Sequence, residues 1–504
     1  MNSAESFGLA VLVAGLAGTA AVLSNRLSER LRVPAPSFFL IGAAAVAQLR
    51  GSPFGVSTVQ SVVTVALAII LFDGGMHMGW GRFRASAGAI LWSGVAGTIV
   101  TAAGAALCAH MLFGFGWRMS LLLGTAISAT DPAVVFSVFG RREVAGRTGT
   151  LLEGESGAND PVGISLLIAL LAATGSAWSV AGHVAIGFAL QMVVGVIAGV
   201  LGGRGLLWFM RRVPLPSEGL YAPRVLAAML CIYGAAAVAH GSGFLAVFIA
   251  GIVIGGVPAP YQREIHRFHS SLASLAEIVA FIMLGLTVRL SSLADGGVWA
   301  TGLGLAALLA FVIRPVLVGL VTLPIRLRRS ERVFFLWTGL KGAVPILLGT
   351  FLVSSGTPGA QRAYEIIFVI VGFSVTLQGG LIPALAHRLR IPLRSVELEP
   401  WSLGVRLRTE PEGLHRYHVV EGSPADGTTI RDLPCGEDVW ISLIIRDGAL
   451  VTADSDMTMR PGDDVLVMAD PADTGLLDRL FGLPGAHLAA WPPAAASRSG
   501  GWVA

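Results

Sequence analysis

The most unusual chemistry in this sequence is a set of carboxylates inside strongly apolar segments. The stretch from Leu151 to Ala172 reads LLEGESGANDPVGISLLIALLA, so Glu153, Glu155 and Asp160 come directly before an unbroken apolar run. An ionisable side chain is costly inside a bilayer and usually marks an ion pathway or a binding site. The acids therefore predict proton or cation chemistry within a membrane-embedded segment.

Six charged residues from six different apolar segments fall at a similar depth. Each lies nine to thirteen residues from the nearest arginine of a polar loop. At a rise of 1.5 Å per residue this offset is roughly 14–20 Å, near the middle of a hydrocarbon core about 30 Å thick. Glu155 lies slightly nearer the loops. The six residues are Asp73, Asp131, Asp160, Glu277, Arg314 and Lys341.

The acids in this layer outnumber the bases. Arg314 and Lys341, the only lysine in the chain, can neutralise two acids. One interpretation makes Glu155 and Glu277 their partners in structural ion pairs that fix helix packing. A buried carboxylate without a counter-charge needs a proton or a metal cation, so the remaining acids predict cation or proton movement. These remaining acids are Asp73, Asp131 and Asp160.

Proline and glycine interrupt three apolar segments near this depth. In SATDPAVVF, Pro132 removes a backbone hydrogen bond and disfavours the α conformation of Asp131. Similar interruptions occur in GLKGAVPI and VTLQGGLIP. Secondary transporters build cation sites from broken helices in both halves of an inverted repeat. The predicted break positions are Pro132, Gly339, Gly342 and Gly379.

The elements that must position these residues are predicted to be transmembrane helices. Hydrophobic residues make up 54% of the 504 residues and charged residues 13%, whereas a soluble chain carries about 25% charged residues. We therefore predict an all-α polytopic membrane protein with an inverted-repeat fold and broken helices. Its first apolar run is read as a retained span rather than a signal peptide. The thirteen predicted spans are 7–24, 36–49, 57–79, 86–113, 118–138, 151–174, 179–210, 222–239, 244–257, 271–288, 297–323, 331–354 and 363–387.

The loops between these spans predict the orientation. Alternate loops, starting with the first, hold 20 arginines, and the opposite set holds four, Arg50, Arg118, Arg289 and Arg362. Basic residues collect on the cytoplasmic side of a membrane protein. The chain is therefore expected in the cell (inner or plasma) membrane, with its N-terminus outside and its C-terminal part in the cytoplasm.

The chain changes character at about residue 395. YHVVEG, VWISLIIRDGALVT and DDVLVMAD are typical of short strands beside Asp-Gly and Pro-Gly turns, and PADTGLLDRLFG of a closing helix. We predict a membrane domain over 1–394, a small cytoplasmic α/β domain over 395–485, and a disordered tail over 486–504.

Several functional classes find no support in the sequence. The three cysteines are far apart and indicate neither a disulfide framework nor a metal site. No glycine-rich phosphate loop or dinucleotide fingerprint is present, and the histidines His77, His110, His183 and His240 form no metal-binding pair. We expect no enzyme, no cofactor, no nucleic-acid partner and no metal beyond a transported monovalent cation. A ligand-gated cation channel is the alternative, although no selectivity-filter segment is visible.

The motifs taken together resemble the monovalent cation:proton antiporters, specifically the NhaP-type branch. The resemblance covers about residues 7–387, and the polar C-terminal part resembles the TrkA-C (RCK-C) regulatory module. That combination is similar to the potassium/proton antiporter subgroup, so K⁺ is the first expectation and Na⁺ the second. The motifs are LFDGG (71–75), ATDPAVV (129–135), EGESGANDP (153–161), GFLAVFIAGIVIG (243–255), FIMLGL (281–286) and GLKGAVPI (339–346).

The resemblance implies a homodimer that exchanges the cation for H⁺ by alternating access, regulated through a small-molecule or nucleotide ligand of the C-terminal module. It implies that Asp160 alternates between proton and cation, and that Asn159 before it accompanies electroneutral 1:1 exchange. Glu155 would pair with a base from a late span, for which Arg314 is favoured over Lys341. The implied cation ligands are Asp160, Asp131, Ser156 and the backbone carbonyl of Thr130, with Asp73 as a possible further ligand.

One position departs from the family pattern. Related chains commonly have arginine where this chain has Lys341. A lysine cannot make the planar bidentate contact of an arginine. Whether Lys341 only pairs with an acid or also helps to set the pH response stays open at this point.

Overall fold

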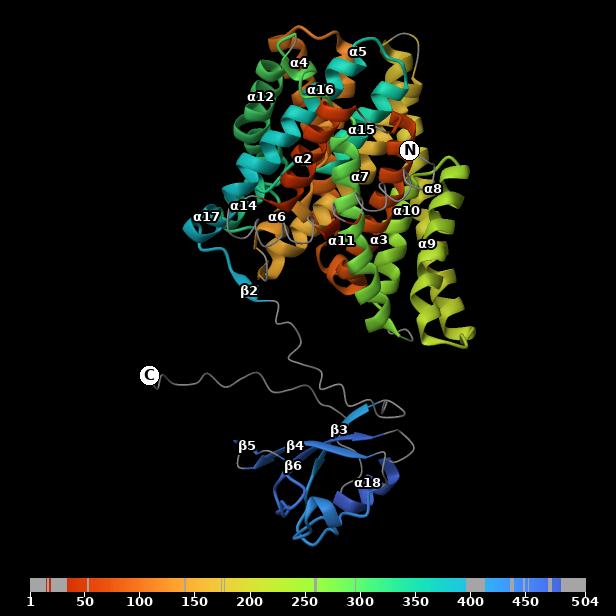
Figure 1. The fold of residues 1–504 in the computed structure, drawn as a ribbon, viewed down its shortest axis with the longest axis vertical. Coiled ribbons are helices and arrows are strands. Elements are labelled where there is room, and N and C mark those ends of the chain that lie inside the picture. The colour runs from red at the N-terminus through yellow and green to blue at the C-terminus, as the bar shows by residue number, and fades with distance from the viewer. Residues whose placement is uncertain are drawn as a thin grey trace. The chain divides into compact units, whose positions relative to one another are not determined.

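The computed structural model divides into two compact units, Met1–Val396 and Glu397–Ala504. Figure 1 shows that the first unit is a bundle of helices and that the second contains a small sheet. The division lies two residues beyond the predicted boundary. The structure describes residues 34–51, 54–139, 142–173, 175, 177–257, 261–294, 296–395, 413–435, 439–446, 449–451, 453–469 and 474–481, with residues 15, 18 and 19. Most of the predicted span 7–24, and the predicted tail over 486–504, lie outside the described residues.

The first unit is mostly helical, as predicted. Among the described residues six helical segments are long and apolar enough to cross a membrane. One of them, Val56–Phe113, has 58 residues, far more than the roughly 20 that one crossing needs. Gly79 interrupts it with a left-handed φ of 58°, which separates the two spans predicted there. In chain order the helices are α2 (Ala35–Arg50), α3 (Val56–Leu91), η1 (Trp92–Ala96), α4 (Gly97–Phe113), α5 (Trp117–Ala126), α6 (Pro132–Phe139), α7 (Gly146–Ala172) and α8 (Ala177–Arg212).

The second half of the bundle contains two π-helical turns, one of which is the longest among the described residues at 10 residues. Such turns are often found at functional sites. The turns η4 and η5 interrupt the helices that begin as α12 and α16. The remaining elements are η2 (Glu218–Leu220), α9 (Tyr221–Val238), α10 (Gly243–Gly255), α11 (Gln262–Gly285), η3 (Ser292–Ala294), α12 (Val298–Leu308), η4 (Leu309–Val318), α13 (Gly319–Val321), α14 (Arg329–Trp337), α15 (Ala343–Ser354), α16 (Ala360–Phe373), η5 (Ser374–Gln378) and α17 (Ile382–Arg388).

Two of the predicted interruptions occur as breaks in the helices. The chain leaves the helical conformation between α5 and α6, directly before Pro132, and between α14 and α15, where Gly339 and Gly342 lie. The break assigned to Gly379 is wrong in position. Gly379 keeps helical dihedrals (φ −62°, ψ −44°), and the irregular part is the π-helical turn η5 just before it. A π-helical turn shifts the backbone hydrogen bonds by one residue without needing a glycine, so the glycine pair was a misleading signal.

Small residues allow α3 and α10 to touch through their backbones. A Cβ atom placed on Gly75 would lie 2.3 Å from the carbonyl oxygen of Phe248, and one on Gly251 would lie 2.3 Å from that of Phe72. Close approach of this kind is typical of helix pairs in membranes, where packing replaces the hydrophobic effect as the force that joins helices. The two helices are therefore locked at the closest distance that backbones permit.

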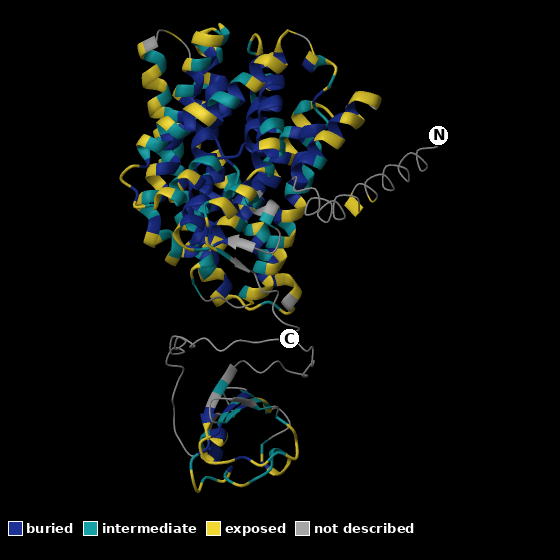
Figure 2. Cartoon of the chain, turned by 90° about the vertical axis from the view of Figure 1, so that its left-hand side faces the viewer, coloured by how far each residue is buried: buried dark blue, intermediate teal, exposed yellow. Residues whose placement is uncertain are grey.

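Burial in the first unit follows the pattern of a membrane protein. Buried residues fill the interior of the bundle, and exposed residues lie on its outer surface (Figure 2). Large apolar side chains are among the most exposed, including Leu49 at 85%, Trp178 at 90% and Val238 at 83%. In water such a surface would be unfavourable, whereas lipid tails provide a matching environment. The surface composition thus agrees with the predicted membrane domain.

One element of the first unit was not predicted. A short strand, β1 (Arg142–Val144), pairs in antiparallel fashion with β2 (Leu393–Ser395). The pairing joins the loop after α6 to the segment after α17. Three-residue strands rich in charged residues carry no periodic apolar signal, so these strands could not be predicted from the sequence.

The second unit is the predicted α/β module. Its four-stranded antiparallel sheet has the order β3-β6-β4-β5. The strands are β3 (Gly413–His418), β4 (Trp440–Arg446), β5 (Ala449–Val451) and β6 (Asp464–Ala469), and the closing helix is α18 (Thr474–Phe481). A short turn of helix, η6 (Ile430–Asp432), lies between β3 and β4. Val465, Val467, Leu477 and Phe481 are fully buried between sheet and helix, so the unit has a core of its own.

A partly buried ion pair ties the turn before β6 to β4. The Arg446 guanidinium donates from Nε to Asp463 Oδ1 at 2.8 Å and from Nη2 to Asp463 Oδ2 at 2.7 Å. Asp463 also accepts the backbone N–H of Arg460 at 2.8 Å and is 1% exposed. The hydrogen bonds and charge of Arg446 hold the pKa of Asp463 below its usual value. Its contribution to stability is therefore present above about pH 3.9, the value in an unfolded chain, and is lost as the pH falls through the lowered pKa.

We predict that Arg446→Gln destabilises the C-terminal unit at pH 7 by about 2 kcal/mol, because a charge-assisted bidentate contact is lost and Asp463 stays buried. Urea unfolding of the unit expressed alone measures this difference, which should shrink at a pH below the Asp463 pKa. Arg431→Gln is the matched control, because Arg431 and its partner Asp456 are 64% and 71% exposed and such pairs contribute less than about 1 kcal/mol. Equal effects of the two substitutions at pH 7 would contradict the prediction.

Candidate ion-binding site

The two helix breaks cross and complete each other's hydrogen bonds. The backbone N–H of Asp131, in the first break, donates to the carbonyl of Leu340 in the second at 2.8 Å. Lys341 Nζ, in the second break, donates to the carbonyls of Ser128 and Ala129 in the first, at 3.0 Å each. Backbone groups released by a break have no water to bind inside a membrane. The crossing therefore supplies the missing partners from protein atoms.

The crossing point has no room for larger residues. A Cβ atom on Gly342 would lie 1.9 Å from Asp131 Oδ2, and one on Gly339 would lie 2.0 Å from Arg314 Nε. Both glycines are thus needed for close approach to a charged side chain. Gly342 thus lets the second break lie directly against Asp131 of the first, and Gly339 leaves room for the Arg314 side chain.

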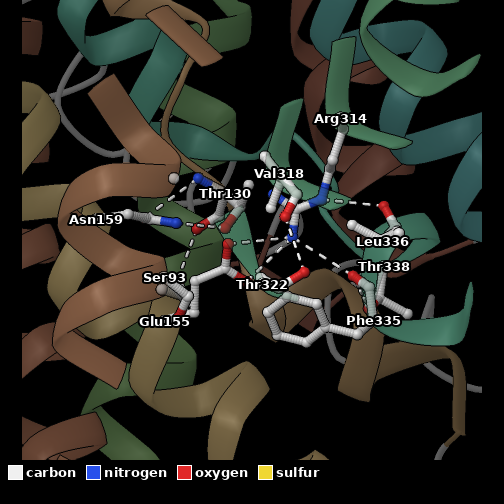
Figure 3. A network of polar contacts seen from close by, with 12 residues as sticks. Ser93, Thr130, Glu155, Asn159, Arg314, Val318, Thr322, Phe335, Leu336 and Thr338 are labelled. Carbon is white, nitrogen blue, oxygen red and sulfur yellow. Dashed lines mark hydrogen bonds and ion pairs between the residues drawn. The ribbon is translucent and has the colours of Figure 1, made fainter. Parts of the chain in front are cut away.

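The residues predicted as cation ligands gather beside this crossing. Ser156 Oγ donates to the carbonyl of Thr130 at 2.5 Å. Asn159 Nδ2 donates to Thr130 Oγ1 at 2.5 Å, and Asn159 Oδ1 accepts the Thr130 N–H at 3.3 Å. Figure 3 shows Asn159 of α7 pointing toward Thr130 in the break after α5. These contacts hold the first break against α7 and place the Thr130 carbonyl beside the Ser156 hydroxyl.

Asp160 lies next to this group with an oxygen that has no partner. Its exposed fraction is 5%, and its Oδ1 has no hydrogen-bond partner among the described residues. The charges of Asp131 and Lys341 both act on it, with opposite signs. Asp160 therefore combines burial, a free acceptor and a second carboxylate nearby, which are the conditions for binding a proton or a small cation.

Glu155 forms the ion pair that the sequence favours. Arg314 Nη2 lies 3.2 Å from Glu155 Oε1 and 3.0 Å from Oε2, and both side chains are about 5% exposed or less. Arg314 also donates to the backbone carbonyls of Leu336 and Phe335, which lie in the last turn of the half-helix α14. Figure 3 shows the guanidinium between the carboxylate and these carbonyls. The pair joins α7, η4 and α14.

The pairing considered for Glu277 and Lys341 is not what the structure contains. Lys341 donates to the backbone carbonyls of Ser128 and Ala129, because the broken helix presents carbonyls that have no partner within the helix. Glu277 Oε1 is buried and has no hydrogen-bond partner among the described residues. The charge that acts on Glu277 is the negative charge of Asp131. Glu277 therefore adds to the surplus of acids instead of reducing it.

Asp73 lies in a different set of contacts. Ser270 Oγ donates to Asp73 Oδ1 at 3.1 Å, and His77 Nδ1 lies 3.4 Å from Oδ2. These partners belong to α3 and α11, whereas the crossing is made by α5, α6, α14 and α15. Asp73, which the sequence groups with Asp131 and Asp160, thus has partners of its own on α3 and α11.

Two residues that hold the second break were not among the predicted site residues. Ser374 Oγ accepts the backbone N–H of Lys341 at 2.9 Å and donates to Gln378 Oε1 at 3.1 Å. Gln378 Nε2 donates to the carbonyl of Trp337 at 2.7 Å, the last residue of α14. Two polar residues four positions apart in the apolar run FSVTLQGG were the available signal.

Comparison with known proteins identifies the family. The profile described as "Sodium/hydrogen exchanger, transmembrane" matches residues 16–388, and the TrkA-C domain profile matches residues 414–482. The K(+)/H(+) antiporter NhaP2 of Shewanella sp. (strain ANA-3) is 32% identical over 488 residues, which cover 95% of this chain and 84% of that protein. The chain is an NhaP-type cation/proton antiporter. It is a multi-pass membrane transporter and not an enzyme.

Two further comparisons agree with the assignment of this antiporter to its family. The K(+)/H(+) antiporter NhaP of Alkalimonas amylolytica is 32% identical over 476 residues, covering 93% of this chain and 82% of its own. The solved structure of the sodium proton antiporter MjNhaP1 from Methanocaldococcus jannaschii superimposes with a TM-score of 0.64 at 21% identity, covering 76% of this chain and 99% of that one. At 21% identity, the similarity to this solved structure shows a shared fold.

We predict that Glu155→Gln lowers the thermal stability of the antiporter strongly, because it leaves the Arg314 charge buried without its counter-charge. Removing one partner of a buried pair typically costs about 3–5 kcal/mol. A thermal shift of the purified protein in detergent measures the change. Glu153→Gln is the matched control, since Glu153 pairs with Arg82 at 3.1 Å where the side chains are 27% and 40% exposed. Equal shifts for the two variants would refute the structural role of the buried pair.

Proposed function

We propose that this antiporter exchanges K⁺ for H⁺, with Na⁺ as the second candidate substrate. The relatives that align over 95% and 93% of the chain are named K(+)/H(+) antiporters. The Na(+)/H(+) antiporter NhaH of Halobacillus dabanensis is 27% identical and aligns over 65% of the chain. The relatives that share the C-terminal part thus support K⁺.

The proposed exchange site consists of Asp160 and Asp131, the Ser156 hydroxyl and the Thr130 carbonyl. The observation that carries this proposal is the buried Asp160 oxygen, which has no hydrogen-bond partner among the described residues; Ser156 lies on the same helix, and Thr130 and Asp131 lie in the break before α6. Oxygen ligands from carboxylates, hydroxyls and carbonyls suit hard monovalent cations. Asp73 is kept as a further candidate ligand with a less direct position.

Competition for one site is enough to couple the two ions. A buried carboxylate is unfavourable without a compensating charge, so Asp160 is expected to hold either a proton or the cation. The arriving cation uses the same oxygen that the proton occupies, which requires the proton to leave. Alternating exposure of the site to the two sides of the membrane then gives exchange, and the crossed breaks are the elements expected to allow that change.

We further propose a homodimer with the N-terminus outside, a cytoplasmic C-terminal domain, and regulation through a small-molecule or nucleotide ligand of that domain. The arginine-rich alternate loops support the orientation. The separate compact C-terminal unit and its match to the TrkA-C profile support a regulatory role for it.

The first test replaces the carboxyl group of Asp160. In proteoliposomes that contain a pH-sensitive dye, Asp160→Asn should abolish cation-driven proton movement, because the amide can release no proton and carries no charge for the cation. Wild-type exchange is measured with K⁺, Na⁺ and Li⁺ in turn. It should be fastest with K⁺, and K⁺ should support it at the lowest cation concentration. Wild-type rates in Asp160→Asn would show that the site is elsewhere.

Asp456→Asn serves as the matched aspartate control. Asp456 is 71% exposed in the C-terminal unit and pairs with Arg431, so its loss should leave the exchange rate unchanged. A faster rate with Na⁺ than with K⁺ would reverse the proposed ion preference without affecting the site.

The stoichiometry has its own test, which depends on Asn159. A 1:1 exchanger shows no net flux when the concentration ratios of cation and proton across the membrane are equal, whatever the membrane potential. We predict this balance point for the wild type. Asn159→Asp, which adds a carboxyl group beside Asp160, should move it. Net proton movement at equal ratios in the wild type would contradict electroneutral exchange.

A further inference from the structure

Two side chains of the π-helical turn η5 are bonded to both ends of the second break. Gln378 Nε2 donates to the carbonyl of Trp337, the last residue of α14, at 2.7 Å. Ser374 Oγ accepts the backbone N–H of Lys341, close to the start of α15, at 2.9 Å. Ser374 Oγ in turn donates to Gln378 Oε1 at 3.1 Å. The Ser374–Gln378 pair therefore spans the break from one half-helix to the other.

The donors and acceptors of this pair allow one arrangement. The Trp337 carbonyl can only accept, so the Gln378 NH₂ group must face it, and the Gln378 oxygen faces Ser374. Ser374 therefore donates its only proton to Gln378 and is left to accept the N–H of Lys341. Ser374 is 1% exposed and Gln378 4%. A buried and fully satisfied network of this kind fixes the groups that it joins.

Apolar packing does not fill the space beside the second break. A cavity of about 10 Å³ lies there, between the break, η5 and residues of α4, α12 and η4. The break and η5 contribute Gly339, Lys341, Ser374 and Gln378 to its lining. In an otherwise close-packed interior, such a space leaves its lining groups without contacts on that side. The hydrogen bonds of the Ser374–Gln378 pair are therefore needed to determine where the break lies.

The second break in turn holds the shape of the first. Lys341 Nζ donates to the carbonyls of Ser128 and Ala129 at 3.0 Å each. The next carbonyl along the chain is that of Thr130, which accepts the Ser156 hydroxyl at 2.5 Å and is a ligand in the proposed site. Because each residue has only two soft backbone dihedrals, fixing the two preceding carbonyls restricts the direction of the Thr130 carbonyl.

We propose that Ser374 and Gln378 are positioning residues that set the cation affinity of the exchange site from outside it. This inference rests on the proposed exchange site. The pair fixes the backbone of Lys341, the Lys341 ammonium holds the first break, and the Thr130 carbonyl is thereby kept in place for the cation. A site whose ligands are fixed in advance loses less conformational freedom on binding. Among the described residues the pair has no hydrogen bond to a proposed ligand, so it acts through Lys341.

The first experiment measures the cation concentration that gives half-maximal exchange, and the maximal rate, for the full-length protein in proteoliposomes at fixed pH. The cation is the one that the wild type exchanges fastest. Ser374→Ala should raise the half-maximal concentration about fivefold, as expected for the loss of one hydrogen bond, and should change the maximal rate much less. Ser374→Thr should stay close to the wild type, because it keeps the hydroxyl group. An unchanged half-maximal concentration in Ser374→Ala, with or without a lower maximal rate, overturns the proposal.

Ser120→Ala is the matched control for the loss of a buried hydroxyl group. Ser120 lies near the start of α5, is fully buried, and donates from Oγ to the Phe115 carbonyl at 3.3 Å. Its substitution should leave the half-maximal concentration unchanged. A rise equal to that of Ser374→Ala would show a general effect of removing a buried hydroxyl group and would overturn the positioning role.

Gln378→Leu tests the other member of the pair independently. It removes the bonds to Trp337 and Ser374, and it should raise the half-maximal concentration at least as much as Ser374→Ala. The double variant should behave like Gln378→Leu alone, because residues of one hydrogen-bond network are not additive. An unchanged value in Gln378→Leu, or effects that multiply in the double variant, would overturn the joint action of the pair.

A second measurement is independent of exchange. For the purified protein in detergent at constant ionic strength, added cation should raise the Tm of the wild type, because a ligand that binds only the folded state stabilises it. Asp160→Asn should remove this increase, and Ser374→Ala should move it to about fivefold higher cation concentrations. An increase that Ser374→Ala leaves at the wild-type concentration overturns the positioning role alone. An increase that Asp160→Asn does not remove refutes the proposed exchange site instead.

Discussion

The structure of the membrane domain depends on one requirement, that backbone groups released by a helix break find partners where no water is available. Two breaks in separate helices meet this requirement together. The Asp131 N–H uses the Leu340 carbonyl, and the Lys341 ammonium uses the carbonyls of Ser128 and Ala129. Because each break depends on the other, the chain can open its helices at the membrane centre, and the Thr130 carbonyl becomes available beside Asp160.

The charges around the crossing divide into two groups with different tasks. Glu155 and Arg314 neutralise each other and hold the backbone end of α14. Asp160 has the Asp131 carboxylate and the Lys341 ammonium as charged neighbours, and Lys341 is itself hydrogen-bonded to the backbone carbonyls of Ser128 and Ala129. The first group stabilises the bundle without depending on the ion, whereas Asp160 has a buried oxygen without a hydrogen-bond partner among the described residues, as the proposed site requires.

The sequence predicted the helices, the two breaks and the Glu155–Arg314 partnership well, because each had a strong local signal: apolar length, Asp-Pro and Gly-Lys-Gly spacing, and a count of buried charges. It failed where geometry between distant segments decides. Lys341 donates to two backbone carbonyls, and Glu277 Oε1 has no hydrogen-bond partner among the described residues, since only the folded chain shows which groups face each other. The short β1–β2 pair and the π-helical turn before Gly379 were missed because neither has a periodic sequence pattern.

The contact between α3 and α10 has a mechanical consequence. Gly75 and Gly251 bring main-chain atoms of the two helices together, so neither helix can slide without main-chain atoms colliding. They must move, or stay still, as one rigid piece. By contrast α7, which carries Asp160, meets α10 through the flexible ring of Phe248 beside Gly157. A ring can rotate while its neighbour shifts. A movement of α7 and its ion-binding residues is therefore easiest at the boundary between α7 and α10, while α3 and α10 keep their positions relative to each other.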